Sequence, residues 1–152
     1  QYLVAAVNGY PNERDERGAI ALLRTYLASD SAGEALKLVT DIETWARGRP
    51  DRKSVLAQTR LLWGDYLFSN GDHRAAAEQF AEVVTQEDVP ATVREWAAYQ
   101  RANCYLKLRR YSESVEAYKQ FLDAYPSSSW KKAAQLRLEY AQLQLRLKEH
   151  LL

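Results

Sequence analysis

Residues 61–84 read LLWGDYLFSNGDHRAAAEQFAEVV, and a degenerate copy of this stretch, CYLKLRRYSESVEAYKQFL, follows at residues 104–122. The two copies are in register, because Gly64 aligns with Ala102, 38 positions later (102 minus 64). An internal repeat of this length is typical of a solenoid of helical hairpins, in which each unit packs only against its neighbours. Such a fold presents a long surface for binding rather than an enclosed site for chemistry.

Apolar residues at helical spacing, interrupted by Gly, Pro, Asn, Asp and Ser, predict an all-α chain without strands. The fold class is an antiparallel helical-hairpin solenoid of about three and a half repeats. The expected helices cover residues 13–28, 33–47, 52–68, 72–87, 90–108, 113–124 and 127–150. Residues 1–152 are expected to form one domain, with units at 12–48, 52–88 and 90–126, the final helix at 127–150, and the end of a preceding helix at 1–9. Ser112 and Ser127–Ser129 are the expected start signals of the last two helices.

The composition argues against several classes of function. The chain has 27% charged residues but a formal net charge of only +1, so no global field attracts nucleic acid or anionic lipid. No apolar run approaches the roughly 20 residues of a membrane span, and we expect no direct insertion into a membrane by this segment. The chain begins at Gln1 and contains no methionine, which favours a piece of a larger protein.

No pattern in the sequence points to catalysis, a metal or a cofactor. His73 and His150 have no second ligand at metal spacing, and Cys104 is the single cysteine, which also leaves the redox compartment open. No glycine-rich phosphate loop and no nucleophile elbow occur. We therefore expect that the protein is not an enzyme, that it has no catalytic residues, metal site or cofactor, and that Cys104 is buried as core filler.

The repeated units resemble the tetratricopeptide repeat, in which small residues let two helices pack closely and aromatic residues fill the seam. Residues 57–88 and 95–126 carry this pattern most fully, and residues 16–46 carry a weaker copy. The matching positions are Gly64, Leu67, Gly71, Ala76, Phe80 and Val83, then Ala102, Tyr105, Tyr111, Ser114, Tyr118, Phe121 and Pro126, and finally Leu23, Tyr26, Ala35, Val39 and Ile42. The turn glycine departs from the pattern, because Gly71 is replaced by Asp30 in the unit before and by Arg109 in the unit after. The resemblance also implies that His73 is exposed.

The unit-to-unit spacing of about 38 to 41 residues exceeds the family consensus of about 34 residues. Long units that end in Tyr-Pro-x-Ser, as residues 125–128 do here, resemble those of bacterial cell-envelope members of the family. The resemblance therefore favours a bacterial periplasm or cell envelope over the cytoplasm, although the compartment itself stays unknown.

The resemblance also implies that the first helix of each hairpin lines a concave groove, which binds a peptide or a segment of a partner protein. By position, the expected groove residues are Arg24, Asp65, Phe68, Trp96, Tyr99, Gln100, Asn103, Arg137 and Tyr140. Aromatic rings beside an amide on one helix face suit an extended peptide. The alternative is that Trp96 and Tyr99 pack as core against the preceding helix. A clamp for a chaperone's C-terminal carboxylate is not expected, because its positions here read Ile20, Arg24, Leu62, Trp96 and Gln100.

The final helix carries two apolar stripes on roughly opposite sides. The stripe that can cover the third unit is Ala134, Leu138, Ala141 and Leu145, and the other stripe is Leu136, Tyr140, Leu143 and Leu147. A terminal helix of a soluble solenoid is usually polar on its outer side. We expect Leu136, Leu143 and Leu147 to form an interface with a further repeat, a second copy of the chain, or a different partner. The second functional hypothesis is therefore a self-associating oligomerisation module that forms a homo-oligomer.

Overall fold

The computed structural model describes residues 13–151, so the helix expected at residues 1–9 lies outside the described part of the chain. The helices are α2 (Glu13–Ala28), α3 (Ala32–Ala46), α4 (Lys53–Ser69), α5 (His73–Val84), α6 (Ala91–Lys107), α7 (Tyr111–Ala124) and α8 (Lys131–Leu151), with a short 3-10 turn η1 (Pro50–Arg52) before α4. The described residues contain no strand. The predicted fold class, an all-α helical-repeat solenoid, is therefore confirmed.

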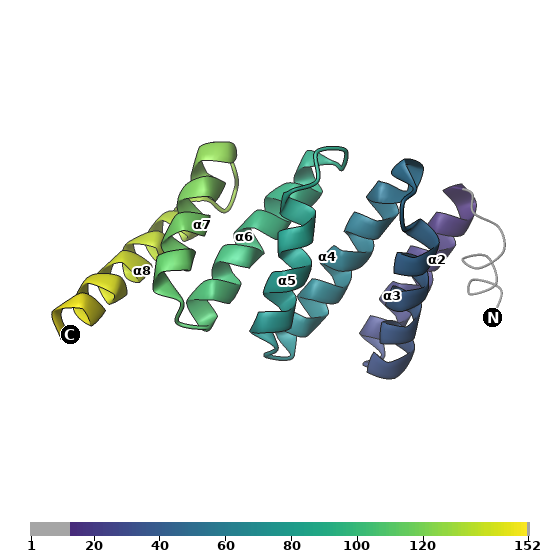
Figure 1. The fold of residues 1–152 in the computed structure, drawn as a ribbon, viewed down its shortest axis with the longest axis horizontal. Helices are drawn as coiled ribbons and strands as arrows, with labels where there is room; N and C mark the ends of the chain where they lie inside the picture. Colours follow the sequence, from purple (N-terminus) through teal and green to yellow (C-terminus); the bar gives the residue numbers. More distant parts are fainter. Residues whose placement is uncertain (1–12, 152) are drawn as a thin grey trace.

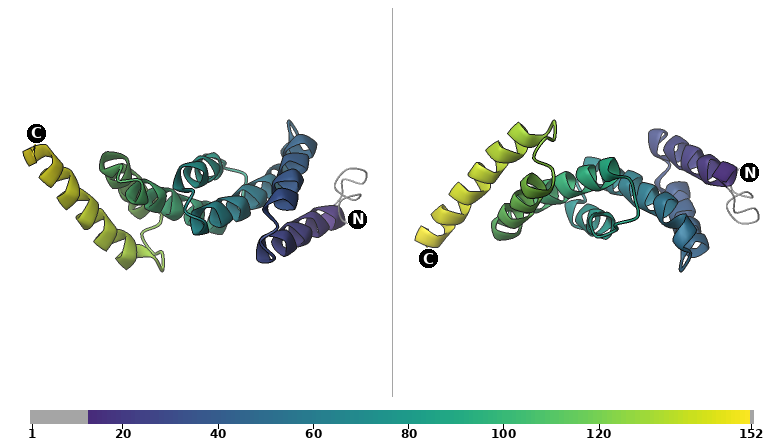
Figure 2. Two further views of the ribbon diagram at one scale, coloured as in Figure 1. Left: turned by 90° about the horizontal axis from the view of Figure 1, so that it is seen from below. Right: turned by 90° about the horizontal axis from the view of Figure 1, so that it is seen from above.

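The helices form a curved row in which α2 and α8 lie at opposite ends (Figures 1 and 2). The helices α3, α5 and α7 lie on one side of the row, and α2, α4, α6 and α8 lie on the other, which we call the A side. Each helix packs against its neighbours in the chain, and α4 also contacts α2 and α6 along the A side. None of these helices is long and apolar enough to cross a membrane.

Three turns on the row share one backbone conformation despite their different residues. Asp30 (φ 56°), Gly71 (φ 84°) and Arg109 (φ 59°) all adopt the left-handed region. The amide of the next residue then bonds a carbonyl five positions earlier, in the pairs Ser31 to Tyr26, Asp72 to Leu67 and Arg110 to Tyr105. This is the hydrogen-bond pattern of a Schellman C-cap. The loss of glycine at two of the three turns is therefore a change of sequence and not of turn geometry.

Two predicted helix starts were wrong. The last hairpin helix, α7, begins at Tyr111 with Arg110 at the N-cap, so its N-cap lies two residues before Ser112, the residue expected there. The tight turn at Arg109 leaves no room for a longer loop, so the helix begins at once. The final helix α8 begins at Lys131, because residues 127–130 form a turn in which the Ser128 hydroxyl accepts from the Trp130 amide at 3.1 Å.

The core lies between the two sides of the row, in clusters that join neighbouring hairpins. Phe80 of α5 is fully buried, and it lies against Gly64 of α4, where an added Cβ would come within 2.8 Å of the ring. One unit later, Tyr118 of α7 is fully buried against α6, where Ala102 takes the place of the glycine. The repeat therefore sets a small residue on the first helix against a large ring on the second.

Candidate functional site

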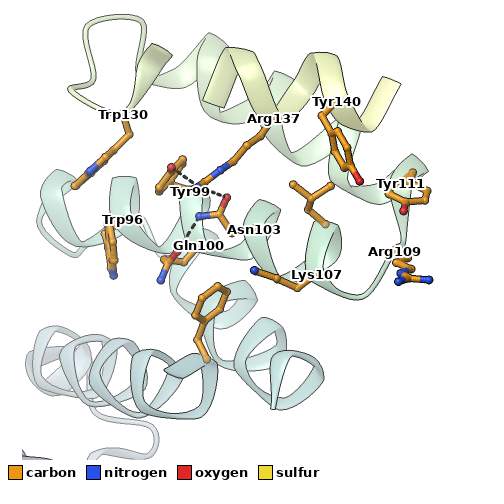
Figure 3. Close-up of a pocket in the computed structure, with 12 residues that line it drawn as sticks. Trp96, Tyr99, Gln100, Asn103, Lys107, Arg109, Tyr111, Trp130, Arg137 and Tyr140 are labelled. Atoms are coloured by element: carbon orange, nitrogen blue, oxygen red, sulfur yellow. Dashed lines mark hydrogen bonds between the residues drawn. The ribbon is translucent and has the colours of Figure 1, made fainter. Parts of the chain in front are cut away.

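A cavity of about 720 Å³ opens on the A side between α6 and α8 (Figure 3). Side chains join these two helices across the cavity, as Arg137 does with Tyr99 and Asn103, whereas α4 lies closer to its A-side neighbours α2 and α6. The lining residues are Phe68, Trp96, Tyr99, Gln100, Asn103, Leu106, Lys107, Arg109, Tyr111, Trp130, Arg137 and Tyr140. A volume of this size falls within the range of pockets that hold small ligands or peptide side chains.

Most of the predicted groove residues meet in this one cavity. Those that line it are Phe68, Trp96, Tyr99, Gln100, Asn103, Arg137 and Tyr140. The other two, Arg24 and Asp65, lie in a separate hollow of about 590 Å³ between α2 and α4. The predicted residues therefore divide between two hollows on the A side, and the one between α6 and α8 holds the larger number.

The cavity has a buried floor and an open rim. Tyr99, Gln100 and Asn103 of α6 are buried and form the floor, while Trp96 is half-buried and Tyr140 is 50% exposed at the rim. The buried residues can meet a ligand only through the atoms that face the cavity. The rim residues offer most of the surface that a partner could cover.

Trp96 and Tyr99 both line the cavity and also pack against other aromatic rings. The Tyr99 ring packs into the seam with α7, 5.4 Å from the Phe121 ring, and stacks on Trp130 at 5.6 Å. The Trp96 ring lies 4.8 Å from Trp130. The Tyr99 ring therefore packs toward α7 and the turn before α8, whereas Trp96 contacts that turn and also donates to Asp65 of the preceding helix α4.

Trp130 is a cavity residue that the sequence analysis did not identify. It sits in the turn before α8, and its ring contacts both Trp96 and Tyr99. Reading residues 127–130 as part of the final helix hid this role. A tryptophan four positions after Pro126, in a turn that begins a new unit, was the available signal.

A chain of hydrogen bonds runs under the cavity floor and joins four helices. Asp65 of α4 accepts from Trp96 Nε1 at 2.9 Å and from Gln100 Nε2 at 3.5 Å. The oxygen Gln100 Oε1 accepts in turn from Asn103 Nδ2 at 2.8 Å. Asn103 Oδ1 accepts from the Tyr118 hydroxyl of α7 and from Arg137 Nη1 of α8, the latter at 2.9 Å. Both amides therefore point their donors toward the carboxylate and their acceptors toward the guanidinium.

Burial raises the pKa of Asp65 above its ordinary value of 3.8, and the hydrogen bonds from Trp96 and Gln100 oppose this only in part. A raised pKa means that the folded state favours the protonated carboxyl group. Its contribution to stability is therefore fully present below pH 3.8 and is lost as the pH rises through the raised pKa.

The substitution Asp65→Asn tests this direction. Its Oδ1 can still accept from Trp96 and Gln100, but the side chain no longer ionises. We expect the free energy of unfolding of wild type, minus that of the variant, to decrease as the pH rises from about 3.5 to 7. Urea unfolding of both proteins across this range measures it. An increase with pH would show that the hydrogen bonds to the carboxylate outweigh its burial.

The other chemically reactive side chains near this site are those of Cys104, Tyr118 and His73. Burial, and then the charge of Asp65, raises the pKa of the fully buried Cys104 thiol to about 12, which confirms Cys104 as core filler. Burial also raises the pKa of the Tyr118 hydroxyl. His73 was expected to be exposed, and this was wrong: it is half-buried, with its ring edge-on to Phe68 at 4.8 Å. Among residues 13–151 no cluster of His, Cys, Asp and Glu could hold a metal ion.

The two stripes of α8 differ in burial as the sequence pattern indicated. Ala134 and Ala141 are fully buried, and Ala134 belongs to the cluster that α8 shares with α6 and α7. On the other stripe Leu136 is 68% exposed, and Leu143 and Leu147 are also exposed. The interface assigned to these three leucines stays a prediction, because the described part of the chain does not cover them.

Comparison with known proteins gives one match. A family model described as tetratricopeptide repeat matches residues 61–129 and, in an overlapping alignment, residues 99–151. Together these alignments span residues 61–151, which is more than half of the chain. Neither a curated protein nor a solved structure gave a match.

Proposed function

Because this chain belongs to the tetratricopeptide repeat family, whose repeats mediate interactions between proteins, we propose that it binds an extended segment of a partner protein in the cavity between α6 and α8. The chain serves in this proposal as one module of a larger protein and has no catalytic role of its own. The observation that carries the proposal is the cavity itself, which brings aromatic, amide and cationic side chains from α4, α6 and α8 to one opening. This mixture gives contact area to a peptide's side chains and hydrogen bonds to its backbone.

Tyr140 is the best position for a test, because it lines the rim and is 50% exposed. We expect Tyr140→Ala to weaken peptide binding by about 2 kcal/mol, which is about thirtyfold, because buried tyrosines dominate such interfaces. Peptides selected from a display library on the wild-type chain, then titrated by fluorescence anisotropy, measure this. Thermal unfolding should change little.

The matched control is Leu36→Ala. Leu36 is 52% exposed on α3, on the opposite side of the row, so its loss removes a similar exposed apolar group. Binding by this control should equal that of wild type. A library in which no peptide binds wild type better than it binds Tyr140→Ala contradicts the proposal.

A second candidate function, self-association through α8, rests on its exposed leucines. The fully buried Ala97 and Cys104 of α6 correspond to Ala134 and Ala141 of α8, both 37 positions later (134 minus 97, 141 minus 104). The same shift places Leu136 and Leu143 where Tyr99 and Leu106 stand in α6, and those residues belong to the cluster that α6 forms with α7 and α8. The α8 leucines therefore have the pattern of a face that another helix covers.

Light scattering separates the two candidate functions. If the chain self-associates through α8, wild type should be a dimer and Leu143→Glu should be a monomer, since a charge on this face disfavours burial. A wild-type chain that stays monomeric at high concentration rejects this candidate and leaves the peptide proposal unaffected.

The proposal includes a bacterial cell-envelope source for the larger protein. Its support is the unit spacing of 38 and the Tyr-Pro-Ser-Ser segment at residues 125–128. In the structure this segment forms the turn that leads from α7 into α8 and sets Trp130 over the cavity. Detection of the parent protein in a periplasmic or membrane fraction of its source tests it.

A further inference from the structure

The charges that line the cavity between α6 and α8 all have one sign. Lys107, Arg109 and Arg137 line it, and none of its lining residues is Asp or Glu. Among the described residues none of these three cations has a carboxylate within 4.0 Å, whereas the neighbouring Arg110 pairs with Glu113 at 2.5 Å. The cavity therefore has an excess of positive charge that the described part of the chain does not neutralise.

Arg137 is held in place but keeps part of its donor set available. Its Nη1 donates to the Tyr99 hydroxyl and, at 2.9 Å, to Asn103 Oδ1. Its guanidinium carbon lies 5.5 Å from the centre of the Tyr99 ring. No bond from Nε or Nη2 to another described residue accompanies these. Arginine carries five N–H donors in a planar fork, so a positioned guanidinium with free donors suits a carboxylate.

The helix dipole explains only part of this charge. Lys107 and Arg109 lie at the C-terminal end of α6, where cations interact favourably with the macrodipole. Arg137 lies in the second turn of α8, far from its C-terminus, and gains nothing from this effect. All three side chains are solvent-exposed, so a ligand that enters the cavity can reach them.

The two ends of the cavity differ in character along α6. Trp96, Tyr99 and Trp130 lie at one end, which has no cation, and Lys107 and Arg109 lie at the other end beside Tyr111 and Tyr140, with Arg137 between the two ends (Figure 3). Trp96 and Lys107 are 11 residues apart (107 minus 96), which is about 16 Å along a helix axis. An extended peptide advances about 3.4 Å per residue, so about five residues span this length.

Among the described residues, one carboxylate bonds residues that line the cavity, and it marks the end opposite Lys107. Asp65 of α4 accepts from Trp96 and Gln100 there, although it lines the neighbouring hollow and not the cavity itself. A negative group on the ligand is therefore repelled at the end near Trp96 and attracted at the end near Lys107. The charges therefore favour a negatively charged ligand and also favour one orientation of that ligand along the cavity.

Resting on the proposed function, we infer that the cavity binds an acidic peptide segment. The segment carries an aromatic or large apolar side chain against Trp96 and Trp130. About three to six residues away it carries Asp or Glu side chains, which meet Arg137 and Lys107. The carboxylates thus supply the negative charge that the cavity lacks, and the apolar side chain fills its other end.

The test begins with a display library of random peptides of about 12 residues, long enough to span the cavity. The library is selected on the wild-type chain, and the selected peptides should be enriched in acidic residues at that spacing from an aromatic residue. These peptides are then titrated by fluorescence anisotropy. The substitution Lys107→Glu should weaken binding about tenfold, and wild-type affinity should fall as salt is added.

Lys119→Glu is the matched control, since Lys119 is exposed on α7 outside the cavity and undergoes the same change of charge. It should bind as wild type does. Selected peptides that are neutral or basic but still lose affinity for Tyr140→Ala would overturn the acidic ligand and leave the proposed function standing. A set in which no peptide distinguishes wild type from Tyr140→Ala overturns both.

Discussion

Replacing Asn103 by leucine is expected to lower the free energy of unfolding by about 3 kcal/mol. The Asn103 amide is buried and has three partners: it donates to Gln100 and accepts from Tyr118 and Arg137. Leucine has a similar size but no polar atom, so all three partners lose a hydrogen bond. A buried group left without a partner costs about 1–3 kcal/mol. This penalty falls mainly on the hydroxyl of Tyr118, because that side chain is fully buried.

A double-mutant cycle isolates the Tyr118 part of this effect. Tyr118→Phe alone should cost about 1 kcal/mol, because Asn103 Oδ1 still accepts from Arg137. In the Asn103→Leu background the same change should stabilise by about 1 kcal/mol, since it removes a buried hydroxyl that has lost its acceptor. Urea unfolding of the four proteins should therefore give a coupling of about 2 kcal/mol. Strict additivity would show that this hydrogen bond contributes nothing to stability.

The hydrogen-bond network bears on function as well as on stability. It fixes Arg137 of α8 over α6, although these two helices have little backbone contact. Asn103 therefore positions the guanidinium that the proposed ligand meets. Asn103→Leu should for this reason also weaken binding of an acidic peptide, which separates it from a substitution that only loosens the core.

The helices and their pairing were predictable because they depend on local periodicity and on repetition. Gly64 and Phe80 recur as Ala102 and Tyr118, and one close contact between helices therefore predicts the next. The turns were predictable in place but not in chemistry. Arg109 takes the left-handed conformation that Gly71 takes freely, because the carbonyls at the end of α6 need the Schellman bonds whatever residue is present.

For the cavity, the sequence predicted the side of the fold on which it lies but not its internal contacts. The resemblance to the tetratricopeptide repeat placed Trp96, Gln100 and Arg137 on the first-helix side, and in the structure all three line the cavity there. Which residues bond each other depends on how α8 is placed relative to α6. The periodicity of the sequence does not determine that placement. The pairing of Asp65 with Trp96, 31 positions later, and the role of Trp130 could therefore come only from the three-dimensional arrangement.

Removing the ring of Phe80 is expected to have the largest effect of any single change, because this ring seals the seam between α4 and α5. The side chain is fully buried and belongs to the cluster that joins α4, α5 and α6. Phe80→Ala should lower the free energy of unfolding by about 4 kcal/mol, through the lost apolar burial and the cavity left behind. Chemical denaturation measures it, and a loss below about 2 kcal/mol would mean that α4 collapses onto α5 without strain.

The close contact between Gly64 and Phe80 can be tested directly, because the effect of Gly64→Ala on the free energy of unfolding should change sign with the residue at position 80. In wild type, Gly64→Ala places a Cβ 2.8 Å from Phe80 Cε1 and should destabilise by about 1–2 kcal/mol, despite alanine's higher helix propensity. In a Phe80→Leu background the ring atoms that clash are gone, so the same substitution should be neutral or stabilising by up to about 1 kcal/mol. Gly33→Ala is the control, since a Cβ there meets nothing within 4 Å and should have the same small effect in both backgrounds. If Gly64→Ala destabilises both backgrounds equally, the glycine serves the backbone of α4 and not its contact with the ring.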